Sequence, residues 1–246
     1  MNNELLDMSR MTILAKAYVK NGQYVPPLAA SGIISHRLFR FAPEDGESSA
    51  YAAASCEEWV KELSHRGATD LKLIVPDELD SFDKLDRANG IPCCIICFYG
   101  NRATVWNKLW VYEPESQKWF VQLIESTIEK THDKPVFNDV TENMVTLLER
   151  IRTLSRKLRL SEFSFRFSAA LKVLQNDLTE PSVPSPLTSR LFHAASEAYV
   201  FGGRGSWTDT AKSAAEGAGL SDEYTFLTRE LYRGIALSIM YAVNEW

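Results

Sequence analysis

The sequence predicts an α+β protein in which an antiparallel β-meander with flanking helices is followed by a mostly α-helical C-terminal half. Three observations support this fold class. Strand-like apolar segments follow one another closely between residues 92 and 125, and apolar residues recur at helical spacing after residue 139. Hydrophobic residues make up 45% of the 246-residue chain, as in ordinary globular proteins. A chain of this length buries roughly 70–75% of its unfolded surface, so we expect it to need no metal, disulfide or cofactor for folding.

The N-terminal elements are two predicted helices and a strand. The first helix covers about residues 4–19 and ends before the turn sequence NGQY. A second helix runs through YAAASCEEWVKELSHRG, with Ser48 or Ser49 as its N-cap and Gly67 as its C-terminal stop. The apolar segment LKLIV at 71–75 then predicts a strand.

The predicted meander consists of the segments CCIICFYG, ATVWNKLWVYE and KWFVQLIE, which are separated by short polar turns. Strands joined by such turns pair antiparallel. Cys94 and Cys97 spell C-x-x-C, a spacing found in redox and zinc sites. Side chains alternate along a strand, however, so Cys93, Ile95 and Cys97 share one face while Cys94 points to the other. The sequence therefore predicts buried structural thiols.

The C-terminal half is predicted to be helical. In DVTENMVTLLERIRTLSRKLRL, leucines recur at helical spacing, and Asp139 with Glu142 offers a capping box. The phenylalanines of SEFSFRFSAALKVLQNDL fit a strand or a helix, and the AALKVL continuation favours the helix. Further helices are expected from Ser185 to about Val200 and from Leu220 onward.

A proline-rich break at 179–186 interrupts the helical part. The chain is therefore predicted to comprise an α+β region at 1–138 and a helical region at 139–246, either as separate domains or as one continuous domain.

Charge and hydropathy restrict the function. The formal charge is −5, which disfavours a nucleic-acid partner because an acidic protein repels a polyanion. The longest apolar stretch, GIALSIMYAV, is far shorter than the ~20 residues that span a bilayer. Glu4 and Asp7 stand where a signal peptide carries positive charge, so the expected location is the cytoplasm and no membrane partner is expected.

The stretch YVFGGRGSWTD at 199–209 is the strongest candidate for a binding loop. It has no P-loop lysine and no surrounding βαβ unit, so neither phosphate-binding motif applies. One interpretation is a helix C-terminus with Gly202 and Gly203 in left-handed conformations, followed by a short helix capped by Thr208 or Asp209. The other is a rigid loop from which Arg204 and Trp207 project toward a ligand, beside Asp209.

No catalytic or metal-binding motif is apparent elsewhere. The four histidines lie in separate segments without metal-ligand spacing, and no G-x-S-x-G sequence occurs. The basic face of residues 150–159 predicts a solvated or acid-paired helix surface. A second candidate binding site is the acidic stretch that contains Asp77, Glu78, Asp80 and Asp83, whose negative potential suits a basic partner.

The C-terminal sequence VFGGRGSWTD, followed by DEYTFLTRELYRGIALSIMYAVNEW, resembles uncharacterised bacterial proteins that carry an FGG-x-GSW-[NT]-D turn and an EY…L…LY helix. Some of these are similar to immunity proteins of contact-dependent or type VI toxin systems. The resemblance covers about a fifth of the chain, and Arg204 stands where a smaller or apolar residue is expected. It implies a bacterial cytosolic protein that binds another protein.

Two functional hypotheses follow. The first is a non-catalytic protein-binding protein, such as a bacterial immunity protein that binds and neutralises a cognate toxin; a basic toxin domain would match the acidic charge. The second is an enzyme or binding protein that acts on a nucleotide or small anion through the Gly202–Gly205 loop, with His193 nearby. Because no catalytic motif is present, the first is preferred.

Overall fold

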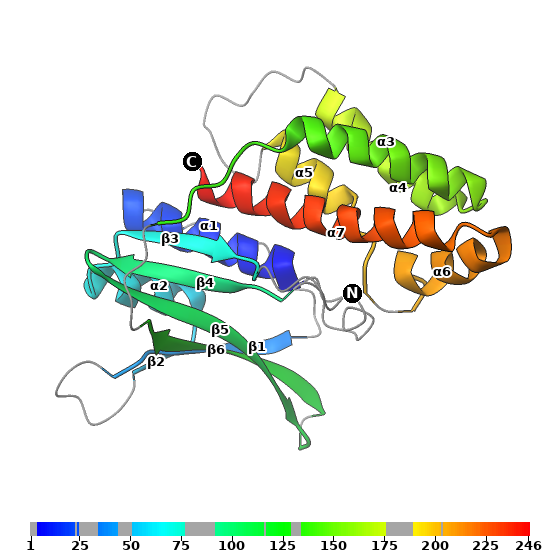
Figure 1. Cartoon of the computed structure of the whole chain (residues 1–246). Coiled ribbons are helices and arrows are strands. Elements are labelled where there is room, and N and C mark those ends of the chain that lie inside the picture. Colours follow the sequence, from blue (N-terminus) through cyan, green and yellow to red (C-terminus); the bar gives the residue numbers. More distant parts are fainter. Residues whose placement is uncertain are drawn as a thin grey trace. The chain divides into compact units, whose positions relative to one another are not determined.

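The chain divides into two compact units in the computed structural model (Figure 1). The sheet unit comprises Met8–Ile74 and Cys93–Pro135, and the helical unit comprises Met1–Asp7, Val75–Pro92 and Val136–Trp246. The structure describes residues 4–22, 24, 34–43, 51–76, 92–115, 117–128, 134–175, 189–202 and 204–246. The proline-rich break at 179–186 lies outside these ranges.

The sheet unit is built on a six-stranded sheet with the order β2-β1-β6-β5-β4-β3. Neighbouring strands from β3 to β6 all pair antiparallel, which confirms the predicted pairing of the three segments between residues 92 and 125. The strands are β1 (Ile34–Arg40), β2 (Ala52–Ala53), β3 (Asp70–Ile74), β4 (Cys94–Tyr99), β5 (Arg102–Glu113) and β6 (Lys118–Thr127).

The sheet is mixed, which corrects the prediction of a purely antiparallel meander. Strand β1 lies parallel to β6, with Phe39 opposite Leu123, and β2 pairs antiparallel with the other edge of β1. Short turns dictate antiparallel pairing, but β1 and β6 are too far apart in the chain for a turn to set their relative direction. Packing in three dimensions therefore decides it.

Helix α2 (Cys56–His65) begins later than predicted. Its N-cap is Ser55 and not Ser48 or Ser49, because the Ser55 hydroxyl accepts a hydrogen bond from the Glu58 N–H at 3.1 Å. The preceding alanines pair with β1 as strand β2. The predicted stop at Gly67 is confirmed: this residue has φ +80°, and the next N–H donates to the Leu63 carbonyl.

Aromatic rings form the core between the sheet and α2. Trp59 of α2 stacks on Phe39 of β1 with ring centroids 4.8 Å apart, and it meets Trp106 of β5 edge-on at 5.6 Å. Phe41 contacts the opposite side of this cluster, 4.8 Å from Trp106. All four side chains are almost completely buried. Helix α1 (Glu4–Asn21), predicted near residues 4–19, contributes most of its length to the same unit.

The four cysteines are free thiols. Cys93, Ile95 and Cys97 are buried, whereas Cys94 and Ile96 are only partly buried. This alternation agrees with the predicted assignment of strand faces.

The helical unit contains five helices among the described residues: α3 (Thr141–Lys157), α4 (Ser161–Gln175), α5 (Arg190–Glu197), α6 (Trp207–Ala218) and α7 (Ser221–Asn244). Near the start of α3, Asp139 accepts hydrogen bonds from the Thr141 N–H and hydroxyl. The ambiguous phenylalanine segment is helical. Phe163 and Phe167 are buried, whereas Phe165 is 73% exposed, as helical spacing requires.

Helices α3 and α7 lie side by side (Figure 1) and approach each other closely at Gly234. A Cβ added to Gly234 would lie 2.8 Å from the Leu147 side chain and 3.4 Å from the Met144 sulfur. A glycine at this point of α7 therefore permits the packing of the two longest helices of the unit. No helix within the described ranges has both the length and the apolar character needed to cross a membrane.

Candidate functional site

The glycine loop at 198–206 connects α5 to α6. The conformational prediction is confirmed for Gly202, which has φ +95°, while Gly203 lies outside the described residues. Helix α5 ends at Glu197, so Gly202 lies within the loop and does not cap the helix as predicted. Gly205 also has a positive φ of +79°. These are conformations that residues with a Cβ rarely adopt.

Two hydrogen bonds hold the loop in place. The Trp207 N–H donates to the Val200 carbonyl at 3.0 Å, which closes the loop at its base. The Gly205 N–H donates to the Asp209 carboxylate at 2.7 Å. Helix α6 begins at Trp207 with Ser206 in the N-cap position, which corrects the predicted cap at Thr208 or Asp209. Asp209 instead lies in the first turn, where it braces the loop and complements the helix dipole.

Trp207 does not project from the loop. Its indole is fully buried, and its edge-on contacts with Phe163 and Phe167 have centroid distances of 5.3 and 5.5 Å. The indole N–H donates to the Thr228 hydroxyl of α7 at 2.8 Å. Since helix α6 starts at Trp207, the first helical turn directs the side chain toward α4 and α7. Trp207 therefore anchors the loop, and its buried side chain is not accessible to a ligand at the surface.

Arg204 and Asp209 remain at the surface of the loop. Arg204 occupies a turn between the two glycines of positive φ and is exposed. His193 is exposed on α5 and contacts the neighbouring Phe192 ring; it has no hydrogen bond or ion pair with Arg204 or Asp209. The structure thus does not assemble the three into a catalytic group.

The loop is poorly suited to phosphate. A phosphate-binding loop presents free N–H groups to the anion, but the Gly205 N–H is already bonded to Asp209. The Asp209 carboxylate also brings a negative charge to the position from which an anion would approach. The acidic candidates Asp77, Glu78, Asp80 and Asp83 lie outside the described residues, so their prediction stands untested.

A buried polar network in the sheet unit was not predicted. Glu125 of β6 is 7% exposed, and its Oε1 accepts hydrogen bonds from the hydroxyls of Thr104 at 2.7 Å and Tyr99 at 3.1 Å. Its Oε2 accepts the Ala42 N–H at 3.0 Å. The carboxylate therefore joins β4, β5 and the segment after β1. The three partners come from β4, β5 and the segment after β1, so no local pattern could reveal them.

The network favours a structural role over a nucleophilic one. Burial raises the pKa of the Cys97 thiol to about 12, and it also raises the pKa of Tyr99 above its ordinary value. Both groups stay protonated at neutral pH, whereas a nucleophilic cysteine needs its thiolate. The carboxylate accepts three donors and so meets the requirements of a buried charge.

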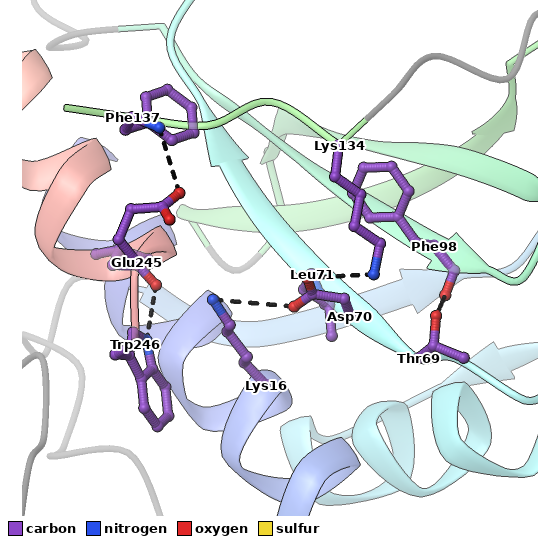
Figure 2. A network of polar contacts seen from close by, with 10 residues as sticks. Lys16, Thr69, Asp70, Leu71, Phe98, Lys134, Phe137, Glu245 and Trp246 are labelled. Atoms are coloured by element: carbon purple, nitrogen blue, oxygen red, sulfur yellow. Dashed lines mark hydrogen bonds and ion pairs between the residues drawn. The ribbon is translucent and has the colours of Figure 1, made fainter.

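A second polar cluster surrounds Asp70, at the start of β3. Figure 2 shows its carboxylate between two lysines: Oδ1 lies 3.8 Å from the Lys16 Nζ, and Oδ2 lies 3.4 Å from the Lys134 Nζ. The Leu71 N–H donates to Oδ1 at 2.9 Å, and the Lys134 ammonium lies 5.3 Å from the centre of the Phe98 ring. The Lys16 side chain is only 2% exposed, and Asp70 neutralises its charge. The cluster therefore ties α1 and β3 together within the sheet unit.

The helical unit presents a different surface along α3 and α7. Phe226 of α7 is 51% exposed, and the Arg150 guanidinium of α3 lies 5.2 Å from the centre of its ring. Two turns after Arg150 on α3, the Lys157 ammonium contacts both carboxylate oxygens of Glu223 on α7 at 3.1 Å. The predicted basic face of α3 is thus partly acid-paired and partly stacked on an aromatic ring.

Within the ranges that the structure describes, no three histidine, cysteine, aspartate or glutamate side chains gather as metal ligands could. Comparisons with protein-family models, with curated proteins and with solved structures give no match to this chain.

Proposed function

We propose that the chain is a non-catalytic protein-binding protein that acts in the cytoplasm as a bacterial immunity protein, binding and neutralising a cognate toxin. The observation that carries the proposal is the braced glycine loop, which presents an exposed arginine while a carboxylate occupies one of its amides. Arginine is among the residues that most often anchor protein interfaces. A loop that is already ordered loses less entropy on binding, which favours affinity.

The buried ionisable groups agree with a non-catalytic role. Three hydrogen bonds to the Glu125 carboxylate give this network a structural role, and the raised pKa of Cys97 leaves no activated nucleophile in it. The formal charge of −5 supports a basic partner, because opposite potentials accelerate encounter and orient the two surfaces. The resemblance of the C-terminal segment to proteins similar to immunity proteins points in the same direction.

The proposal is tested by isolating the partner and measuring its contact with the loop. Pull-down from the native organism should recover a protein that forms a stoichiometric complex and whose toxicity is relieved by co-expression. Arg204→Ala should weaken that complex by about tenfold or more, the effect of losing an interface anchor. Lys212→Ala is the matched control, since Lys212 is an exposed cation on the same unit.

Calorimetric titration with a nucleotide panel tests the rival function. We expect no heat of binding, because the Asp209 carboxylate competes for the loop amide. Saturable micromolar binding that Arg204→Ala abolishes would instead establish the loop as an anion site and overturn the proposal.

A further inference from the structure

A second surface of the helical unit has the composition of a docking site. It consists of Phe226, Arg229 and Arg233 on α7 together with Arg150 on α3, and we call it the α7 arginine face. The three α7 residues are exposed and are spaced by three, four and seven positions, which places them on one side of the helix. Arg150 extends this side across to α3 through its contact with the Phe226 ring.

This face is distinct from the glycine loop. Trp207 packs against Tyr224 and bonds to Thr228, so those two residues define the side of α7 that faces α6. At about 100° per residue, Phe226 lies roughly 160–200° around the helix axis from both of them. A partner on the α7 arginine face would therefore approach a different side of α7 from the one that anchors the loop.

The charges on this face are unbalanced. Among the described residues, the side chains of Arg229 and Arg233 have no hydrogen-bond or ion-pair partner, and the Arg150 guanidinium contacts only the Phe226 ring. Of the acids on α3 and α7 near these arginines, Glu223 is neutralised by Lys157, which leaves Glu149 next to Arg150, Asp222 at the start of α7 and the half-buried Glu230. Asp222 also interacts favourably with the positive end of the helix dipole. Three guanidinium groups without a carboxylate partner among the described residues thus share one side of the helical unit with the half-exposed Phe226 ring.

We propose that the α7 arginine face docks an acidic protein segment that carries an apolar side chain between carboxylates. Guanidinium groups bind carboxylates in bidentate geometry, and the aromatic ring provides apolar contact area at the centre. A nucleic acid fits less well, because three arginines form a short track and the chain's net charge of −5 opposes a long polyanion. The site goes beyond the proposed function, since it selects the opposite charge from a basic toxin.

Selection from a library of random phage-displayed peptides, using the full chain as target, tests the proposal. Enriched peptides should carry aspartate or glutamate on both sides of a leucine or an aromatic residue. Fluorescence anisotropy with a labelled, enriched peptide should show binding that weakens with added salt and falls about tenfold or more in Arg229→Glu/Arg233→Glu. Phe226→Ala should weaken binding as well, whereas Phe165→Ala, which alters an exposed ring on α4, should not.

Thermal melts establish that each variant is folded before binding is measured. The proposal is overturned if the selected peptides show no acidic preference, if their binding is unaffected by Arg229→Glu/Arg233→Glu, or if a single-stranded oligonucleotide binds more tightly at this face. Self-association lost in the same double variant would assign the face to a second copy of the chain and would equally overturn it. None of these outcomes depends on Arg204 or on a toxin, so the two proposals fail separately.

Discussion

The sheet unit and the helical unit both enclose tryptophans, but they treat the indole N–H groups differently. In the sheet unit, Trp59 and Trp106 are fully buried, and neither Nε1 has a hydrogen-bond partner in the described part of the chain. In the helical unit, the buried Trp207 donates to Thr228. The core of the sheet unit therefore relies on ring packing, in which the face of one aromatic ring can weakly accept an N–H from another. In the helical unit, a directional hydrogen bond orients the indole ring.

Buried ionisable groups also distinguish the two units. Burial raises the pKa of Cys94, Cys97 and Tyr99, all in the sheet unit. The helical unit exposes Arg150, Arg229 and Arg233 on the side of α3 and α7 that carries Phe226. The difference teaches that the sheet unit places ionisable groups in its interior, while the helical unit exposes charged groups that another molecule can contact.

The largest effect should come from placing a charge in the sheet core. Ile95 is fully buried on the face that carries Trp106, while its neighbour Ile96 is only half-buried on the other face. Ile95→Asp should cost more than about 4 kcal/mol and abolish the yield of folded protein, because an unpaired carboxylate would be desolvated. Ile96→Asp should be milder. Urea denaturation and expression yield measure the stability of both variants. Equal losses of stability in the two variants would show that the two faces of β4 do not differ in burial.

Removal of the Trp207 acceptor should have the next largest effect. Thr228→Val keeps the shape of the side chain but leaves the indole N–H buried without a partner, which should cost about 1–3 kcal/mol. Thr225→Val on the exposed side of α7 is the matched control and should stay within about 0.5 kcal/mol of the wild type. Urea unfolding followed by tryptophan fluorescence compares the two. A neutral Thr228→Val would remove the contrast between the two tryptophan environments.

The glycine loop tests backbone conformation separately from packing. Gly202 has φ +95° with nothing within 4 Å of an added Cβ, so Gly202→Ala should destabilise by about 1–2 kcal/mol through backbone strain alone. Gly217 is an exposed helical residue with equal space and no positive φ. Gly217→Ala should stabilise by about 0.5–1 kcal/mol. Gly202→Ala should therefore lower the melting temperature and Gly217→Ala should raise it. A shift of both variants in the same direction would contradict the positive φ of Gly202.

The smallest effect is a pH dependence confined to the sheet unit. Burial raises the pKa of Cys97 from 9.0 to about 12, so the folded state retains a proton that the unfolded state loses above pH 9. Stability should therefore fall as pH rises, by about 1 kcal/mol between pH 8 and pH 10 from this thiol. Cys97→Ala should lose less stability over that interval, because the Cys97 thiol no longer contributes while Cys94 and Tyr99 still do. Urea denaturation at pH 8 and pH 10 measures this difference. If wild type and Cys97→Ala lose the same free energy of unfolding between the two pH values, Cys97 is not the source of the pH dependence.

Sequence patterns located most of the regular structure. The helical spacing in α3 and the apolar segments of β4 to β6 required only near neighbours in the chain, and the predicted elements agree with the observed ones. Strand β1 was not predicted, and the start of α2 was placed too early, because the pairing of β2 with β1 competes with helix formation there. Pairing across a sheet depends on partners that local propensity does not contain.

The candidate site was only partly predictable. The glycine pattern correctly placed a positive φ at Gly202 and surface positions at Arg204 and Asp209. It did not predict that Trp207 is buried, since the rings that receive it belong to a helix about forty residues earlier in the chain. The α7 arginine face was also missed, because Arg150 and Phe226 meet only when α3 and α7 pack together.

By itself, the sequence determined most of the helices and the strands β3 to β6, a glycine with positive φ in the loop, and the acidic charge of the chain. These properties follow from interactions between residues a few positions apart. Tertiary structure decided the parallel direction of β1, the burial of Trp207 and the carboxylate network of Glu125. The bond between Glu125 and the Ala42 N–H spans 83 positions, and such a contact forms only when folding brings distant segments of the chain together.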